Sequence, residues 1–245
     1  MEEGLTKASE EGVPQGGVLS AVLSNVYLHY VLDLWFERRF RLGCQGEAYL
    51  FRYADDFVAC FQNQEDTERY REAMEVRLRE FNLEIEPSKT KLLRFGATAG
   101  EVAEREGQNP ESFDFLGFTH YCGHTRSGHF KVKRRTSKKK FRGKLKEVTF
   151  WLKTNRSRLK KSELLRRAKA RVEGHLNYYA ITDNGPACND YLYQVRRLLF
   201  KWMNRQSQKR SYTWDRFAHA LAWVKWPQVR IRTNLSPFVP LSASK

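Results

Sequence analysis

The hydrophobic pattern changes character after Thr136, and this change limits the possible fold more than any other feature of the chain. Before Thr136, short runs of aromatic and β-branched residues alternate with helical spacing. After it, apolar residues recur every three or four positions over 137–154, 160–181, 187–206 and 213–224. We therefore predict an α+β fold, in which an antiparallel sheet with helices is followed by an all-α region.

Charge follows the same division of the chain. Residues 126–171 hold 20 Lys and Arg against 2 Asp and Glu, whereas residues 1–125 hold 13 against 22. The whole chain carries a net charge of +16. A positive field this concentrated favours a polyanionic partner, and nucleic acid is the most common one. The alternative is a basic face kept for solubility, which leaves many like charges without a counterpart.

Composition excludes several classes of protein. Hydrophobic residues make up 41% of the chain, so a sizeable core can be buried and a largely disordered protein is excluded. No apolar run approaches the ~18 residues of a membrane span, and the N-terminus lacks the apolar stretch of a signal peptide. Four scattered cysteines are typical of a reduced protein. We expect a cytoplasmic protein with no membrane partner.

Two short strand patterns, Tyr49–Tyr53 and Phe57–Phe61, predict a β-hairpin with Asp55 and Asp56 at its turn. Adjacent carboxylates repel each other, and Mg²⁺ is a hard cation that would hold such oxygen ligands together. Two such ions about 3.5–4 Å apart can catalyse phosphoryl transfer. A plain polar turn explains this tetrapeptide equally well, so the neighbouring motifs must decide between the two interpretations.

The other elements of the front region follow from the same patterns. We expect an amphipathic helix capped by Ser20, a helix over 65–82, strands at Leu83–Glu86 and Lys91–Phe95, an exposed loop over 96–112, and a hairpin formed by Phe113–Tyr121 and His129–Lys133.

Four motifs occur in one order along the chain. They are the loop Gly12–Ser20 ahead of a helix, Tyr53-Ala54-Asp55-Asp56, Pro87–Lys91, and Phe115–Phe118. In this order and spacing the chain resembles the reverse transcriptases encoded by group II introns, and the motifs resemble those of the polymerase palm. The resemblance continues with Arg171–Tyr179, Trp202 and Trp214, which look like the maturase-specific thumb. It covers residues 12 to 225.

The resemblance implies an RNA-directed DNA polymerase, a nucleotidyltransferase of a mobile element that also acts as the RNA-splicing maturase of its intron. Asp55 and Asp56 would ligate catalytic Mg²⁺. Tyr53 and Ala54 would lie against the primer terminus and the template. Lys89 would neutralise or protonate the departing pyrophosphate, and the alternative is an exposed lysine in a turn.

The remaining matched positions would contact nucleic acid. Gln15, Gly16 and Gly17 would lie beside the incoming nucleotide and the template, where glycine permits close backbone approach. Phe115, Leu116, Gly117 and Phe118 would form the primer grip, although a plain buried strand is also credible. The RNA-binding cations would be Lys138, Lys139, Lys140, Arg142, Lys144, Lys160, Lys161, Arg166, Arg167, Lys169 and Arg171.

These motifs set the expected domains: a partial palm over 1–125, a junction over 126–136, a helical thumb and maturase domain over 137–226, and an irregular tail over 227–245. The family palm also needs an upstream Asp and the fingers, and no Asp precedes Asp33, which we expect to be structural. We therefore expect an N-terminally truncated form with an incomplete two-metal site. Its partners would be intron RNA, a DNA primer or target, dNTPs, and a second chain that supplies the fingers and the missing Asp. The alternative is a catalytically inactive maturase remnant that binds intron RNA.

Overall fold

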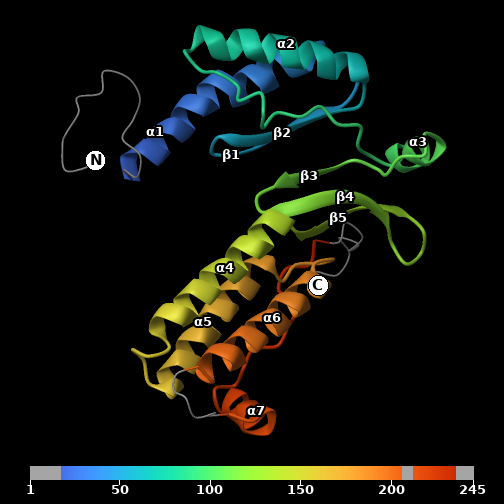
Figure 1. The fold of residues 1–245 in the computed structure, drawn as a ribbon. Helices are drawn as coiled ribbons and strands as arrows, with labels where there is room; N and C mark the ends of the chain where they lie inside the picture. The colour runs from blue at the N-terminus through green and yellow to red at the C-terminus, as the bar shows by residue number, and fades with distance from the viewer. Residues whose placement is uncertain (1–17, 206–211, 236–245) are drawn as a thin grey trace, which may run out of the picture. The chain divides into compact units, whose positions relative to one another are not determined.

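The structure is a computed structural model, and it describes residues 18–205 and 212–235. The chain divides into two compact units, which we call the front unit (residues 1–92) and the back unit (residues 93–245). Each is described by itself. Figure 1 shows the helices and strands of both units. No helix in the described ranges is long and apolar enough to cross a membrane.

The described part of the front unit starts with a long, nearly continuous helical stretch, which is followed by a β-hairpin and a further helix (Figure 1). Its elements are α1 (Val18–Leu28), the π-helical turns η1 (His29–Asp33) and η2 (Phe36–Phe40), the 3₁₀ turn η3 (Arg41–Gly43), β1 (Ala48–Tyr53), β2 (Asp56–Phe61) and α2 (Gln64–Glu80). The two strands pair antiparallel and form a two-stranded sheet.

Aromatic rings fill the core of the front unit. Tyr70 on α2 is 4% exposed, and its ring centroid lies 5.0 Å from that of Phe61 and 5.2 Å from that of Phe40. Met74 and Leu78 follow it on the same face of α2 and are buried. The helical spacing predicted for this segment is therefore confirmed, and the hairpin packs on helices through one of its two faces.

The first predicted helix forms, but one detail of the prediction is wrong. Ser20 lies inside α1 and does not cap it. The apolar residues of the N-terminal half are exposed, with Leu19 at 75% and Val22 at 56%. The buried residues come later, at Val31 and Phe36. Within the described front unit, the helical stretch is buried from its π-helical turns onward, while α1 itself makes polar contacts through Asn25 and Tyr27.

The strands predicted at Leu83–Glu86 and Lys91–Phe95 are absent, and the chain is irregular there. Leu83 packs against the front core without pairing in a sheet. The backbone then turns at Glu86, whose carbonyl accepts from the N–H groups of Lys89 and Thr90, both at 3.1 Å. Pro87 has no N–H to give to a ladder, so the apolar residues indicated burial but not strand pairing.

The back unit combines a three-stranded antiparallel sheet with four long helices. Its elements are α3 (Ala99–Arg105), β3 (Ser112–Phe115), β4 (Phe118–His124), β5 (Phe130–Thr136), α4 (Lys138–Asn155), α5 (Lys161–Tyr179), α6 (Gly185–Met203) and α7 (Trp214–Trp223). The four predicted C-terminal helices are confirmed, and so is the mixed fold class. A short helix, α3, occupies part of the predicted loop.

Helices α4, α5 and α6 lie side by side in the back unit (Figure 1). Their facing residues form its core, with Leu152 on α4, Val172 on α5 and Leu199 on α6 at most 1% exposed. Ser137 begins α4, because its side chain accepts from the N–H of Lys140. Phe217 of α7 is also fully buried in this core.

A buried asparagine joins the helices to the sheet. Asn184, between α5 and α6, is 0% exposed, and its Oδ1 accepts from the Thr136 N–H at 2.7 Å. Its Nδ2 donates to the Thr136 hydroxyl and to the Tyr179 carbonyl, both at 2.8 Å. Beside it, Lys131 and Asp183 form an ion pair at 2.9 Å. These bonds fix the end of β5 against the α5–α6 connection.

Candidate catalytic hairpins and nucleic-acid interface

The turn between β1 and β2 is two residues long. Tyr53 pairs with Asp56 across the strands, so Ala54 and Asp55 form the turn itself. Ala54 has φ 54°, in the left-handed region that residues with a Cβ rarely adopt. Strained backbone of this kind persists only where the surroundings hold it. The hairpin predicted from the sequence is confirmed, with both carboxylates at its tip.

Arg52 supplies the contacts that hold this turn. Its Nε and Nη2 donate to the two carboxylate oxygens of Asp33 at 2.7 and 2.6 Å. Its Nη1 donates to the Ala54 carbonyl at 2.9 Å and to Oδ1 of Asn25 at 3.0 Å. The guanidinium therefore ties the strained turn residue to the long helix, and a bidentate pair of this kind fixes geometry as well as charge. We call this group of four residues the arginine lock.

Asp33 has the structural role predicted for it. Its partial burial alone would raise the pKa of the carboxyl, but hydrogen bonds from Arg52 and His29 outweigh burial and lower the pKa below 3.8. Sequence reasoning missed Arg52 and Asn25. The available signal was the strand alternation, which places Arg52 on the inner face with Ala48 and Leu50. A charged residue on that face needs a partner.

The two turn carboxylates, in contrast, have no side-chain partners in the part of the chain that the structure describes. Asp55 and Asp56 are exposed, and neither forms an ion pair or side-chain hydrogen bond with any described residue. Free carboxylate oxygens are the donors that a hard divalent cation takes. No group of three or more His, Cys, Asp or Glu that could hold a metal occurs within 18–205 and 212–235. The donor chemistry fits Mg²⁺, with two protein carboxylates in place.

An exposed aromatic face extends from this turn along β1. Tyr49, Phe51 and Tyr53 alternate with the inward residues and are 46%, 56% and 66% exposed. The rings of Tyr49 and Phe51 are stacked, with centroids 6.5 Å apart. Because paired residues share a face, Asp56 lies on the same side as Tyr53. One carboxylate thus borders a flat aromatic surface.

A second two-residue turn joins β3 to β4. Phe115 pairs with Phe118, and the turn residues Leu116 and Gly117 have φ 49° and 81°. Two successive positive φ values are the signature of a type I′ hairpin turn. The sequence had suggested one strand over Phe113–Tyr121, and that prediction is wrong because the chain reverses in the middle of it.

The end of α5 anchors this second turn. The Tyr178 hydroxyl donates to the Leu116 carbonyl at 2.7 Å, and the Tyr179 ring packs on Phe118 at 5.2 Å between centroids. A Cβ added at Gly117 would lie 2.9 Å from the Tyr179 hydroxyl oxygen, so glycine is needed for space as well as for φ. The four residues predicted as a primer grip thus form a rigid, tyrosine-backed turn in the back unit.

Two other predicted sites are less informative. Lys89 lies in an exposed turn, and its backbone N–H donates to the Glu86 carbonyl. The pKa of the Glu86 carboxyl is lowered by hydrogen bonds from Ser88 and by the nearby Lys89 charge. The Gln15, Gly16 and Gly17 positions lie outside the described residues.

The predicted RNA-binding cations differ in their partners. Several are engaged within their own helix: Lys144 with Glu147 at 2.8 Å, Arg167 with Glu163 at 2.6 Å, Arg166 with Glu163 at 4.0 Å, and Lys169 with Glu173 at 3.6 Å. Others lie over rings: Arg171 over Trp151 at 4.5 Å and Lys161 over Tyr212 at 5.4 Å. No ion pair or ring contact involves Lys138, Lys139, Lys140, Arg142 or Lys160 within the described ranges.

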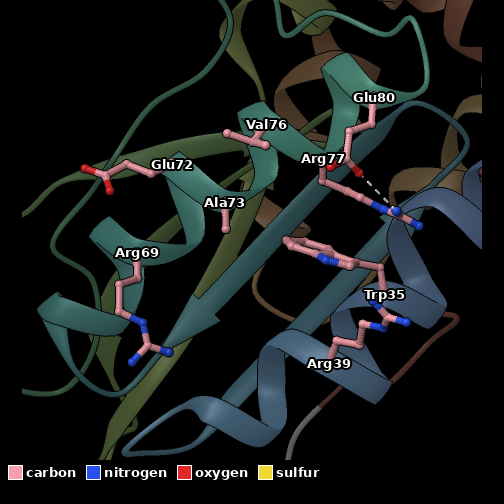
Figure 2. Close-up of a pocket in the computed structure, with 8 residues that line it drawn as sticks. All are labelled: Trp35, Arg39, Arg69, Glu72, Ala73, Val76, Arg77 and Glu80. Atoms are coloured by element: carbon pink, nitrogen blue, oxygen red, sulfur yellow. Dashed lines mark hydrogen bonds and ion pairs between the residues drawn. The ribbon is translucent and has the colours of Figure 1, made fainter.

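A shallow groove of about 500 Å³ lies on the front unit between the long helix and α2. It is lined by Trp35 and Arg39 of the long helix and by residues of α2 that include Ala73 and Val76 (Figure 2). Arg77 on its rim pairs with Glu80 at 3.3 Å (Figure 2). None of the predicted site residues lines this groove.

One family model matches the part of the chain that carries both hairpins. Residues 2–120 match the family model described as reverse transcriptase (RNA-dependent DNA polymerase). The matched segment contains both two-residue turns and the arginine lock, and it ends within β4. None of the curated proteins compared with the chain matches it. Residues 2–120 are therefore similar to a reverse transcriptase domain.

Proposed function

We propose that this chain is an RNA-directed DNA polymerase of the kind encoded by group II introns, and that it also serves its intron as a maturase. One observation carries the polymerase proposal. Within the segment that matches reverse transcriptases, two carboxylates without a partner among the described residues stand at the tip of a turn that Arg52 holds in a strained conformation. A turn with only a structural role does not require free carboxylates beside a locked backbone.

Asp55 and Asp56 would hold Mg²⁺, which would supply charge neutralisation at the reacting phosphate and an activated primer hydroxyl. Tyr53 and Ala54 would position the primer terminus. Gln15, Gly16 and Gly17 would approach the incoming dNTP, and Lys89 would stabilise the departing pyrophosphate. The tyrosine-backed turn Phe115–Phe118 would hold the primer strand as a rigid element.

Two carboxylates alone form a weak site, because Mg²⁺ gives up its bound waters reluctantly and has low affinity for a site with so few carboxylate ligands. We therefore propose that a further carboxylate completes the two-metal site, and that it comes from a segment or second chain carrying reverse transcriptase fingers. The described residues offer no third carboxylate beside the turn.

The maturase role rests on the basic helices. The domain proposed over 137–226 carries the cations named above. When such cations neutralise RNA phosphates, counterions are released, and this release favours binding whatever the RNA sequence. Intron RNA and a DNA primer or target are the proposed partners. The second candidate function, an RNA-binding maturase remnant without polymerase activity, is supported by the same cations together with the two-carboxylate site.

Primer extension on an RNA template with Mg²⁺ tests the polymerase proposal. The chain is assayed alone and then with an added polypeptide that carries fingers and an upstream Asp. Extension that requires the added polypeptide and is lost in Asp55→Asn supports both the polymerase and the split site. RNA binding without extension in either mixture supports the remnant. Extension by Asp55→Asn at the parent rate contradicts the assigned role of the turn.

A further inference from the structure

One face of α4 carries a row of cations that form no ion pair with any residue the structure describes. Lys139, Arg142, Lys146 and Lys153 are exposed and follow one another at intervals of three, four and seven residues, which places them on the same side of a helix. The row spans about 21 Å at the α-helical rise. No acidic side chain within the described ranges forms an ion pair with any of the four. We call these residues the α4 row.

The α4 row differs from the cations of α5. On α5, Arg166 and Arg167 share Glu163, and Lys169 lies 3.6 Å from Glu173. Even on α4, Lys144 points to another side and pairs with Glu147. An anion that approaches α5 must therefore compete with carboxylates already in place, whereas one that approaches the α4 row does not.

An apolar groove runs beside the α4 row. It lies between α4 and α6, has a volume of about 450 Å³, and is lined by Leu145, Lys146, Thr149, Phe150, Lys153, Gln194 and Leu198. This volume lies in the lower part of the roughly 300–1,000 Å³ range of small-ligand clefts. Figure 1 shows α4 and α6 in the same helical layer of the back unit.

Phe150 is the most unusual residue of the groove, because its side chain is 72% exposed. It lies between Lys146 and Lys153 on α4, and both lysines also line the groove. Across the groove, the Gln194 amide nitrogen donates to Asp190 at 3.2 Å, and the Gln194 amide oxygen has no partner among the described residues. An exposed aromatic residue thus lies between two cations on α4, and an amide oxygen without a partner among the described residues belongs to the same groove.

We propose that this groove binds one unpaired nucleotide of an RNA strand, with the base stacked on Phe150 and its flanking phosphates held by Lys146 and Lys153. The inference rests on the proposed RNA-binding function and assigns its single-stranded contact. Every base has a flat π face, so stacking on an aromatic ring tolerates any sequence. Arg142 and Lys139 would guide the adjacent backbone along α4.

The charges argue for nucleic acid as the occupant. An apolar peptide would gain from Phe150 and Leu198 but not from the two lysines, Lys146 and Lys153, that line the same groove. Duplex RNA would meet the cations, but its bases are stacked within the helix and recognition of single bases requires unpaired ones. An unpaired RNA nucleotide satisfies both the apolar floor and the cationic rim.

The test measures binding of the full chain to a short single-stranded RNA that contains a fluorescent purine analogue. We expect Phe150→Ala to weaken binding about tenfold and to abolish the fluorescence change of the analogue, whereas Phe150→Trp retains both. Lys146→Gln and Lys153→Gln should each weaken binding. Each should also make the negative slope of log binding constant against log salt concentration shallower by about 0.7. Phe150→Ala should leave that slope unchanged, because it removes no charge.

Matched controls lie elsewhere on the back unit. Tyr193→Ala removes an exposed aromatic side chain from α6 instead of α4, and Arg216→Gln removes an exposed cation from α7. Neither should alter the fluorescence change. Binding of a blunt RNA duplex should be insensitive to Phe150→Ala.

Three results would overturn the inference. The first is equal weakening of duplex and single-stranded binding by Phe150→Ala. The second is unchanged single-stranded affinity in that variant while the parent chain binds tightly, which leaves the proposed RNA-binding function intact. The third is loss of self-association in Phe150→Ala with unchanged RNA affinity, which would assign the groove to a second copy of the chain. Failure of the parent chain to bind any RNA would instead reject the proposed function.

Discussion

The two tight hairpins of this protein share a turn length but differ in what holds them. The β1–β2 turn is held from beside the strands by a charged group, because Arg52 bonds to Ala54 and Asp33. The β3–β4 turn is held by aromatic packing and one tyrosine hydroxyl, through Tyr179 and Tyr178. In both, a residue with a Cβ adopts positive φ, which costs about 1–2 kcal/mol and must be offset by these contacts.

The difference separates two uses of the same geometry. The first turn leaves its own side chains, Asp55 and Asp56, exposed and without partners among the residues that the structure describes. The second turn places Phe118 in the core, with 8% of its surface exposed. In the first turn the arginine bonds to a backbone carbonyl, so the side chains of the turn stay available for chemistry. In the second turn the flanking side chains pack into the core and make the turn rigid. The predictions below challenge this contrast, from the largest expected effect to the smallest.

Asp55→Ala should reduce primer extension in the completed polymerase by about 10³-fold or more, because a metal ligand is lost. RNA affinity and the free energy of unfolding should stay nearly constant, since the carboxylate is exposed and no described residue is its partner. Primer-extension rates, filter binding and chemical denaturation measure the three quantities. Glu75→Ala, at an exposed site on α2, is the control. If stability and RNA affinity fell together in Asp55→Ala, the first turn would have a structural role, and the proposed difference between the two turns would be wrong.

Gly117→Ala should lower the free energy of unfolding of the back unit by about 2–4 kcal/mol. Alanine at φ 81° is strained, and its Cβ would lie 2.9 Å from the Tyr179 hydroxyl oxygen. Gly143→Ala is the matched control, because this α4 glycine has nothing within 4 Å of an added Cβ. It should stabilise the unit by about 1 kcal/mol. Urea denaturation followed by tryptophan fluorescence compares them, and equal effects would contradict the packed-turn account.

Acid should loosen the anchor of the second turn before it loosens the first. His175 stacks on Tyr191 and Tyr179 at 3.6 and 4.5 Å between centroids. Burial, with a smaller effect from the Lys144 charge, lowers the pKa of His175 from 6.5 to about 4. The unfolded chain therefore binds more protons between these values, so stability is full above pH 6.5 and falls as the pH drops toward 4.

The expected loss over this range is about 2–3 kcal/mol, and His175→Phe should remove most of it while keeping the stacked ring. His120, whose pKa is also lowered by burial and by Arg134, should leave a small residual slope. The Asp33 carboxyl, with its pKa below 3.8, keeps its charge until a lower pH. Unfolding measured at several pH values tests this order. Equal pH dependence in His175→Phe would show that the anchor is not acid-sensitive.

Arg52→Gln should lower the stability of the front unit by about 1–2 kcal/mol, because Asp33 would lose its bidentate partner in a site only partly open to solvent. Adding Asp33→Asn should recover part of this loss, since no unpaired charge then remains. Arg71→Gln, at an exposed site on α2, is the control. Polymerase activity should fall in Arg52→Gln beyond the fraction unfolded, because Ala54 would lose its anchor. Full activity would mean that the turn keeps its shape without the lock.

The first hairpin could be predicted from the sequence because period-two alternation is local. Tyr49–Tyr53 and Phe57–Phe61 bracket two residues, so the register follows directly. The arginine lock could not, since Arg52 reaches partners 19 and 27 residues away. No local pattern couples those positions. An inward-facing arginine in β1 indicates only that it has an acidic partner, and does not identify that partner.

The second hairpin was missed for a different reason. Leu116-Gly117 lacks the Asn-Gly or Asp-Gly pair that marks a type I′ turn, so apolar alternation continued through it. The turn depends on Tyr178 and Tyr179, which lie more than 60 residues later, since the Tyr178–Leu116 bond spans 62 positions. The unequal cations of α4 and α5 were also hidden, because composition counts charges without their partners.

The β1–β2 ribbon has one further consequence, which concerns its backbone. It is a two-stranded sheet, so within the described residues the outer edge of each strand has no strand neighbour. Unpaired main-chain N–H and C=O groups along an edge can accept an added strand, whatever its side chains. A strand added beside β2 would place every second side chain on the face that carries Asp56. Backbone register alone would then decide which residue of the incoming strand lies next to the turn carboxylates.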